Sequence, residues 1–335
     1  MTKIKVGIIG AGRIGKLHAE NLVNNIGSVE VKSIADVFAD KIETWAHSIG
    51  IKNVYSDYHD ILNDPEIDAI LICSSTNTHS PISIEAAKAG KHIFCEKPID
   101  YDLDRIHAVL DAVKTAGVKF QVGFNRRFDH NFKAVRDMVQ AGKIGDPHII
   151  KVTSRDPEPP TAEYAKVSGG MFLDMTIHDF DMVRYLSGSE VDEVYAAASV
   201  LVDPAIGEAG DVDTALITLK FKNGAIGVID NSRKAVYGYD QRVEVFGSKG
   251  GITVSNDTGS SAVLSTSEGV FSDKPKYFFL ERYKDSFIDE LKDFFEAIKE
   301  NKETPVTGID GLKPVLIAFA AKKSLLEGRA VKVEE

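Results

Sequence analysis

The residues best suited to catalysis are a carboxylate and an imidazole four positions apart. Asp174 and His178 lie in the stretch GGMFLDMTIHDFD, and in a helix this spacing brings both side chains to one face, about 6 Å apart. The carboxylate would orient the imidazole and raise its basicity, so that His178 could accept a hydroxyl proton while hydride leaves the carbon. Taken alone, the pair is more often a capping Asp beside an exposed His. Asp174 with Asp181 also fits the carboxylate pair of a glycosidase.

A lysine follows an apolar run in the first half of the chain. Lys97 lies in the tripeptide Glu96-Lys97-Pro98, directly after KHIFC. If that run is a buried parallel strand, its carboxyl end faces the ligand crevice of the sheet. The ammonium could then donate a hydrogen bond to a substrate hydroxyl and stabilise the alkoxide that develops as hydride leaves. A surface lysine paired with Glu96 explains the same residues equally well, so both interpretations stay open at this point.

A glycine-rich string near the start of the chain could bind a dinucleotide. GAGRIG at 10–15 matches GxGxxG, follows the apolar run IKVGII and opens a helical pattern. Its first glycine permits a tight turn, the second lets the backbone approach a diphosphate, and the third allows close packing of helix on strand. The N-terminus of the helix offers unpaired N–H groups to the phosphates. The residues predicted to bind the diphosphate are Gly10, Gly12, Arg13, Ile14 and Gly15.

An acidic residue ends the next apolar run, about twenty residues after the glycines, where a carboxylate can bind both hydroxyls of the adenosine ribose. This residue is Asp36. Its charge would repel a 2′-phosphate, and residues 37–39 supply no Arg or Ser to bind one. The pattern therefore predicts NAD rather than NADP. The alternative, a glycine-rich turn and an Asp36 that is only solvated, explains fewer of these sequence features than a dinucleotide site does.

Polar side chains gather after the fourth apolar run, in CSSTNTH. A loop at the carboxyl edge of a doubly wound sheet can line the path of the cofactor. Ordinary turn chemistry explains these hydroxyls and amides nearly as well. We predict that the cofactor-binding residues of this region are Ser74, Ser75, Thr76, Asn77 and His79, joined by Glu96 and Lys97 after the fifth run.

The elements that position these residues change in type along the chain. Up to residue 123, apolar runs of about five residues alternate with amphipathic segments of 10–15, which predicts a parallel sheet buried on both faces. After Phe124 come a helix at 131–141, a Pro-rich connector and several consecutive strands, with Asn223-Gly224 as a hairpin turn. We therefore predict an α/β protein with a doubly wound domain at 1–123 and an α/β domain with a mainly antiparallel sheet at 124–335.

Composition narrows the class of protein. The chain has 335 residues and a formal net charge of −10, with 43% hydrophobic and 27% charged residues. At roughly 150 residues per domain this length predicts about two domains. The acidic balance without a basic cluster argues against nucleic acid, and no apolar stretch reaches the roughly 18 residues of a membrane span. Cys73 and Cys95, the only cysteines, form no CxxC pair for a metal, which is typical of a protein of the reducing cytoplasm.

Taken together, the motifs resemble a known family. The strand–GxGxxG–helix pattern, Glu96-Lys97-Pro98 and the Asp-x-x-x-His pair are similar to the Gfo/Idh/MocA oxidoreductases over essentially the whole chain. Within that family, YGYDQR at 237–242, EVFGS at 244–248 and Arg155-Asp156-Pro157 look most like the members that oxidise inositols. The resemblance implies NAD-dependent oxidation of myo-inositol to its 2-keto form, scyllo-inosose. One alternative is an NAD(P)-dependent dehydrogenase that acts on scyllo-inositol or another sugar or polyol. A less favoured alternative is a non-catalytic NAD-binding sensor.

The same resemblance implies roles for individual residues. The catalytic residues would be Lys97, Asp174 and His178, with His178 as general base. The polyol would contact these three together with Arg127, Asp156 and Tyr237. The family also implies a Rossmann domain, a cis Lys97–Pro98 bond and a large open sheet whose uncovered face builds homodimers or homotetramers. The C-terminal helix, at 311–327, would pack back on the first domain, and no metal is implied.

Overall fold

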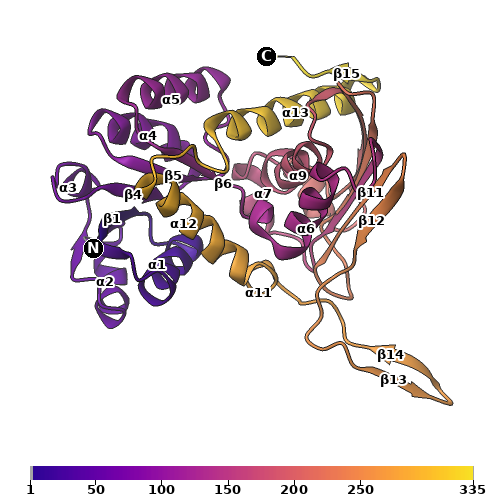
Figure 1. The fold of residues 1–335 in the computed structure, drawn as a ribbon, viewed down its shortest axis with the longest axis horizontal. Helices are drawn as coiled ribbons and strands as arrows, with labels where there is room; N and C mark the ends of the chain where they lie inside the picture. Colours follow the sequence, from indigo (N-terminus) through magenta and orange to yellow (C-terminus); the bar gives the residue numbers. More distant parts are fainter. Residues whose placement is uncertain (1–2, 335) are drawn as a thin grey trace. The chain divides into compact units, whose positions relative to one another are not determined.

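The computed structural model describes residues 3–334, which divide into two compact units (Figure 1). The first unit runs to Asn125 and also contains Asp285–Lys313. The second unit contains Arg126–Lys284 and the chain from Pro314 onward. The predicted fold class, α/β with a parallel and a mainly antiparallel sheet, is confirmed. Among the helices of residues 3–334, none is long and apolar enough to cross a membrane.

The first unit is built on a six-stranded parallel sheet in the order β3-β2-β1-β4-β5-β6, the strand order of a dinucleotide-binding domain. Most residues of these strands are apolar because helices cover both faces. They are β1 (Ile4–Ile9), β2 (Val29–Ala35), β3 (Asn53–Tyr55), β4 (Ala69–Ile72), β5 (His92–Glu96) and β6 (Phe120–Gly123). The helices are α1 (Arg13–Asn25), α2 (Ala39–Ser48), α3 (His59–Leu62), α4 (His79–Lys88), α5 (Leu103–Ala116) and α12 (Lys284–Lys299), with a short 3-10 turn, η1 (Thr76–Thr78).

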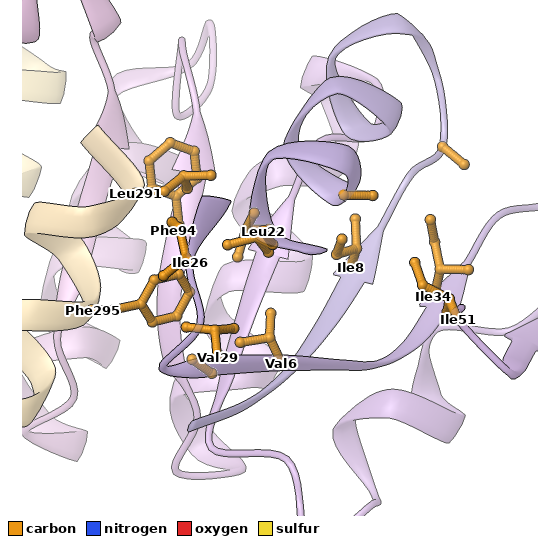
Figure 2. Packing of buried hydrophobic residues seen from close by; sticks show 14 of the residues in the cluster. Val6, Ile8, Leu22, Ile26, Val29, Ile34, Ile51, Phe94, Leu291 and Phe295 are labelled. Carbon is orange, nitrogen blue, oxygen red and sulfur yellow. The ribbon is translucent and has the colours of Figure 1, made fainter. Parts of the chain in front are cut away.

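The core of the first unit includes a helix from far along the chain. Phe94 of β5 packs with Leu291 and Phe295 of α12, beside Leu22 of α1 (Figure 2). The predicted boundary placed all of 124–335 in the second domain, whereas 285–313 belong to the first unit. The amphipathic pattern of α12 indicates that one face is buried, but it does not indicate which sheet covers that face.

The second unit is built on a seven-stranded sheet in the order β12-β11-β7-β10-β9-β8-β15. All neighbouring pairs are antiparallel except β7 and β10. The strands are β7 (Pro147–Arg155), β8 (Val191–Ser199), β9 (Thr214–Phe221), β10 (Ile226–Ser232), β11 (Asp240–Gly247), β12 (Gly250–Val254) and β15 (Val331–Lys332). A separate ribbon of β13 (Val263–Thr266) and β14 (Gly269–Ser272) projects from it (Figure 1).

Buried and exposed residues alternate along the strands of the second sheet, because only one face is covered by helices. The helices are α6 (His130–Gln140), α7 (Ala162–Val167), α8 (Met171–Asp174), α9 (Ile177–Ser187), α10 (Pro204–Glu208) and α11 (Phe279–Arg282). Of these, α9 packs on β7. The other face carries exposed apolar side chains, among them Leu216, Ile226 and Phe246.

The last helix, α13 (Gly308–Glu327), begins in the first unit and continues in the second. Near its start, a Cβ at Gly311 would lie 2.5 Å from Ile99, so only glycine fits there. Near its end, Ser324 accepts a hydrogen bond from the backbone N–H of Ala196 in β8, at 3.0 Å. The start of α13 thus packs on residues of the first unit and the part from Pro314 onward groups with the second unit, and the packing of the whole helix back on the first domain stays a prediction.

Candidate functional site

The glycine turn after β1 has the geometry that its sequence predicts. Gly10 has φ +93°, and a Cβ there would lie 2.5 Å from the backbone nitrogen of Ser74. A Cβ at Gly15 would lie 2.0 Å from the carbonyl oxygen of Gly10. Around Gly12, by contrast, a Cβ would meet nothing within 4 Å among the described residues. The turn is therefore closed on the protein side at Gly10 and Gly15, and open at the N-terminus of α1, where a diphosphate would approach.

Asp36 follows β2 and is tied to the same turn. Its Oδ2 accepts a hydrogen bond from the backbone N–H of Ala11 at 2.7 Å, and its Oδ1 accepts one from the N–H of Phe38 at 2.9 Å. The carboxylate is half-buried, so each oxygen keeps a lone pair available on its open side. This arrangement fits the binding of ribose hydroxyls beside the diphosphate. It also gives Asp36 a structural role that the motif does not reveal.

The loop after β4 contains one predicted cofactor-binding residue, His79, that is buried. Ser74 and Thr78 share a hydrogen bond at 2.6 Å, and Ser75 and Asn77 are exposed. His79 is only 2% exposed. Its ring nitrogens lie 2.8 Å from the carbonyl oxygen of Pro98 and 3.0 Å from that of Ser74. His79 thus lies between the loop and the segment after β5, and its part in cofactor binding stays a prediction.

Lys97 follows the end of β5 and is half-buried, and its peptide bond to Pro98 is cis. The preceding residue, Glu96, turns its carboxylate towards His18, whose Nε2 lies 2.7 Å away. Glu96 was predicted to line the cofactor path. One oxygen of its carboxylate is thus engaged by a buried side chain of the first unit, and its contact with the cofactor stays a prediction.

In the second unit, Asp174 and His178 do not lie in one helix. Asp174 ends α8, the chain turns at Met175 and Thr176, and His178 lies in the first turn of α9. The expected helical face is therefore wrong. Both residues are half-buried. The carboxylate of Asp174 accepts hydrogen bonds from the hydroxyl of Tyr164 and from the guanidinium of Arg233, each at 2.9 Å.

Arg233 is the main polar residue that the sequence analysis missed. It is 4% exposed and bridges Asp174 and Asp156, with Nη1 at 3.2 Å from the carboxylate of Asp156. Burial raises the pKa of Asp156, while Arg233 acts to lower it and Asp174 to raise it. A signal does exist in the sequence. Inward positions alternate along β10, and continuing that alternation from Ile229 and Asn231 points the side chain of Arg233 inward too.

Two neighbouring arginines anchor the helix that carries His178. Arg127 makes a bidentate pair with Asp181, at 2.8 and 2.6 Å. Arg126 donates to Asp179 at 2.6 Å and is 4% exposed. Arg127 was predicted to contact a polyol, but two of its N–H groups are used in this pair. The pair also removes Asp181 from the glycosidase alternative, because its carboxylate is already neutralised.

Tyr237, the remaining predicted substrate contact, lies after β10 and is 38% exposed. Its hydroxyl donates to Asp240 at 2.6 Å and accepts from Arg155 at 3.1 Å. Burial, followed by the hydrogen bond to Asp240, raises the pKa of Tyr237. The hydroxyl is thus held in one place, and it retains a lone pair that a ligand hydroxyl could use.

The chain matches two family models. Residues 4–124 match the model of the Gfo/Idh/MocA oxidoreductase family with an NAD-binding Rossmann fold, and residues 132–253 match a Gfo/Idh/MocA C-terminal domain. Among curated proteins, the chain is 56% identical to the uncharacterized oxidoreductase YrbE of Bacillus subtilis, covering 100% of this chain and 98% of that one. It is 52% identical to the myo-inositol 2-dehydrogenase of Thermotoga maritima, covering 99% of each.

Among solved structures, the chain is also similar to dehydrogenases. A probable dehydrogenase from Thermotoga maritima aligns with a TM-score of 0.96 at 52% identity, covering 98% of each chain. The scyllo-inositol dehydrogenase of Lactobacillus casei, solved with bound NAD(H) and scyllo-inositol, aligns with a TM-score of 0.92 at 30% identity, covering 99% of each chain.

Proposed function

We infer the activity from the premise that this chain belongs to the Gfo/Idh/MocA oxidoreductase family, and we propose that it oxidises myo-inositol to scyllo-inosose with NAD. It is an oxidoreductase with an NAD-binding Rossmann domain. The observation that supports myo-inositol as the substrate is the 52% identity, over 99% of both chains, to a protein named myo-inositol 2-dehydrogenase.

The first unit would hold NAD. The residues fit this cofactor, because Gly12 leaves the N-terminus of α1 open and Asp36 lies beside the same turn. When bound, the nicotinamide supplies the acceptor for the hydride. The carboxylate of Asp36 would exclude a 2′-phosphate by charge repulsion, so NAD is favoured over NADP.

Three side chains would carry the chemistry on the substrate. Lys97 would donate a hydrogen bond to the reacting hydroxyl and stabilise its developing negative charge. His178 would accept the hydroxyl proton as general base. Asp174 would orient the imidazole, and Arg233 would keep Asp174 ionised in its half-buried position.

Asp156 and Tyr237 would contact the remaining ring hydroxyls, because each offers an oxygen held in place by a neighbouring arginine. Arg127 would act at a distance, by anchoring α9 through Asp181. Together these groups suit an uncharged polyol with several hydroxyls.

A substrate screen tests the proposal. The purified protein is incubated with myo-inositol, scyllo-inositol and a panel of aldoses, with NAD or NADP, and formation of reduced cofactor is followed by absorbance. We expect the highest kcat/KM with myo-inositol and NAD. A preference for scyllo-inositol would support the alternative substrate. No reduction with any polyol would contradict the proposal and favour a non-catalytic NAD-binding protein.

Cofactor choice is tested with Asp36→Ser, whose shorter neutral side chain removes the repulsion. We expect NADP turnover to rise relative to NAD by about tenfold or more, as loss of about 1.4 kcal/mol of discrimination would give. Equal use of the two cofactors by the unaltered protein would contradict the role of Asp36.

The proposal also includes a homo-oligomeric assembly and a cytoplasmic location. The uncovered face of the second sheet, with Leu216, Ile226 and Phe246, would join copies of the chain into a dimer or tetramer. Cys73 and Cys95 are both free thiols, which suits the reducing cytoplasm.

A further inference from the structure

Three titratable side chains from three separate elements meet inside the first unit. His18 comes from α1, Glu96 from the end of β5, and Glu290 from α12. The Nε2 atom of His18 lies 2.7 Å from Glu96 and 4.0 Å from Glu290, and the polar atoms of all three lie within 4.8 Å of one another. The side chains of His18 and Glu290 are 0% exposed. The proposed chemistry uses neither of them.

The surroundings of this cluster are apolar and shaped to admit the carboxylate of Glu96. Glu96 pairs in register with Gly123 of β6, and a Cβ at Gly123 would lie 3.0 Å from its carboxyl group. Glycine there leaves room for Glu96 to turn inward. The imidazole of His18 packs edge-on against Phe94 and Phe287, with ring centroids 5.3 and 5.9 Å apart. Charge in such a place is poorly solvated.

The hydrogen-bonding partners indicate where the protons lie. The Nδ1 atom of His18 has no partner among the described residues. A buried N–H without an acceptor is rarer than an acceptor without a donor. We therefore assign a neutral imidazole that carries its proton on Nε2 and donates it to an ionised Glu96.

Glu290 differs from Glu96 because neither of its carboxyl oxygens has a hydrogen-bond partner among residues 3–334. A second carboxylate, buried and unpaired beside the first, would be strongly unfavourable. Burial, and secondarily the nearby charge of Glu96, raise the pKa of Glu290 well above its usual value. Glu290 is accordingly a neutral carboxylic acid.

We propose that His18 and Glu290 are positioning residues: His18 holds Glu96 through their hydrogen bond, and Glu290 fills the space beside His18, so that the adjoining Lys97 is fixed relative to α1, the helix that begins at the glycine turn. The proposal rests on the function given above, because it assigns Lys97 a catalytic role. It explains why an α/β domain keeps three ionisable groups in its interior: they connect the cofactor helix, the lysine and α12.

A metal ion is the competing explanation of the same cluster. The contact between His18 and Glu96 has the length of a direct hydrogen bond, 2.7 Å. A histidine that binds a metal normally donates its other ring nitrogen to a partner, and the Nδ1 atom of His18 has none among the described residues. Both observations favour protons over a cation.

The first experiment needs no substrate. The groups that face Glu290 are His18 from α1, Glu96 from β5 and the thiol of Cys73 after β4. Burial is the main cause that raises the pKa of the Cys73 thiol, and the charges of Glu96 and Glu290 add to it. Because the pKa of Glu290 is raised in the folded state, its contribution to stability is complete at low pH and is lost as the pH rises. Glu290→Gln keeps the shape of the neutral acid and cannot ionise. We expect its Tm to exceed that of the unaltered protein by a margin that grows from about pH 5 to about pH 9. A margin independent of pH would overturn the assignment of a carboxylic acid.

The second experiment separates positioning from stability. His18→Leu removes the hydrogen bond to Glu96, Glu290→Leu removes the polar group beside His18, and Glu290→Gln and His18→Gln restore a neutral amide. With myo-inositol and NAD, we expect kcat to fall about tenfold to a hundredfold in each Leu variant, as displacement of a catalytic group would cause. Each Gln variant should recover most of the loss. Leu variants that change only the Tm would overturn the positioning role.

Two further outcomes keep the alternatives apart. If no polyol is oxidised, the proposed function fails while the dependence of Tm on pH still tests the carboxylic acid. If the protein binds one equivalent of Zn²⁺ or Mn²⁺, measured by metal analysis, and Glu290→Gln loses it, the cluster is a cation site and the proposal is overturned.

Discussion

Arg233 controls the charge balance around the proposed catalytic aspartate. It is the guanidinium that bridges Asp156 and Asp174, and it is buried. Without it, two half-buried carboxylates would face each other uncompensated. A buried arginine between two carboxylates is thus expected to stabilise the fold, and in the proposed mechanism it keeps Asp174 ionised.

We expect Arg233→Met to lower the free energy of unfolding by about 3 kcal/mol at neutral pH, measured by urea denaturation. Arg233→Lys, which keeps the charge but not the two-armed geometry, should recover part of it. Because Arg233 acts to lower the pKa of Asp156, its loss should matter less in acid, where that carboxyl is neutral. Unchanged stability of the Met variant would contradict the bridge.

His178 is the residue on which the proposed proton transfer depends. We expect His178→Asn to lower kcat by about 10²–10⁴, the usual effect of losing a general base, and to leave the Kd of NAD nearly unchanged by fluorescence titration. His130→Asn is the matched control, because its side chain is 68% exposed and lies in the same unit. Full activity in the His178 variant would exclude it as the base.

At this scale the sequence predicted the conformation of the glycine turn, because the positive φ of Gly10 and the close packing of Gly15 belong to the motif itself, whereas the contact of these glycines and Asp36 with a cofactor stays a prediction. It did not predict Arg233, His18 or Glu290. Their partners come from distant segments, and the pairing of such segments is set by tertiary packing. The pair of Arg127 with Asp181, 54 positions away, was not predicted for the same reason, and the contact of Arg127 with a polyol stays a prediction.

At the scale of elements, a loop before β9 determines where α8 lies. Asp213 accepts hydrogen bonds from the backbone N–H groups of Leu201, Val202 and Asp203, at 2.8 to 3.0 Å. Two residues earlier, Asp211 accepts one from the N–H of Met171 at 2.9 Å, at the start of α8. This loop therefore holds the short helix that ends in Asp174.

We expect Asp213→Asn to lower the free energy of unfolding by about 1–3 kcal/mol, because an amide cannot accept the same set of N–H groups. Burial acts to raise the pKa of Asp213, but the three backbone donors outweigh it and hold the pKa below its usual value. The stabilisation is therefore present at neutral pH and is lost as the pH falls below about 4. Denaturation curves of the two proteins should converge in acid, and a constant difference would contradict this account.

The order of helices and strands was easier to predict from the sequence than the breaks between them. Period-two and helical patterns predicted the alternation of strands and helices in the first unit and the consecutive strands of the second, since each pattern repeats over its whole length. The break between α8 and α9 escaped prediction. The segment from Met171 to Ser187 has no Pro or Gly inside it, and the break depends on contacts such as that of Thr176 with Asn231, at 2.7 Å.

At the scale of the whole molecule, the uncovered sheet face predicts assembly. We expect Leu216→Glu to shift the protein towards monomer in size-exclusion chromatography with light scattering, because it puts a charge into the proposed interface. Leu326→Glu is the control, since this leucine is 79% exposed and lies on α13 rather than on the sheet. An unaltered protein that is already monomeric, or a dissociating control, would contradict the interface.

The first unit combines two segments that are far apart in the sequence, so its core cannot be complete until both have been synthesised. The ribosome releases the chain from its N-terminus, so β1 to β6 emerge long before α12. Until α12 arrives, the side of Phe94 that will meet Leu291 and Phe295 faces water. The core of the first unit is therefore completed only after α12 has been translated, and until then its exposed apolar side chains favour aggregation.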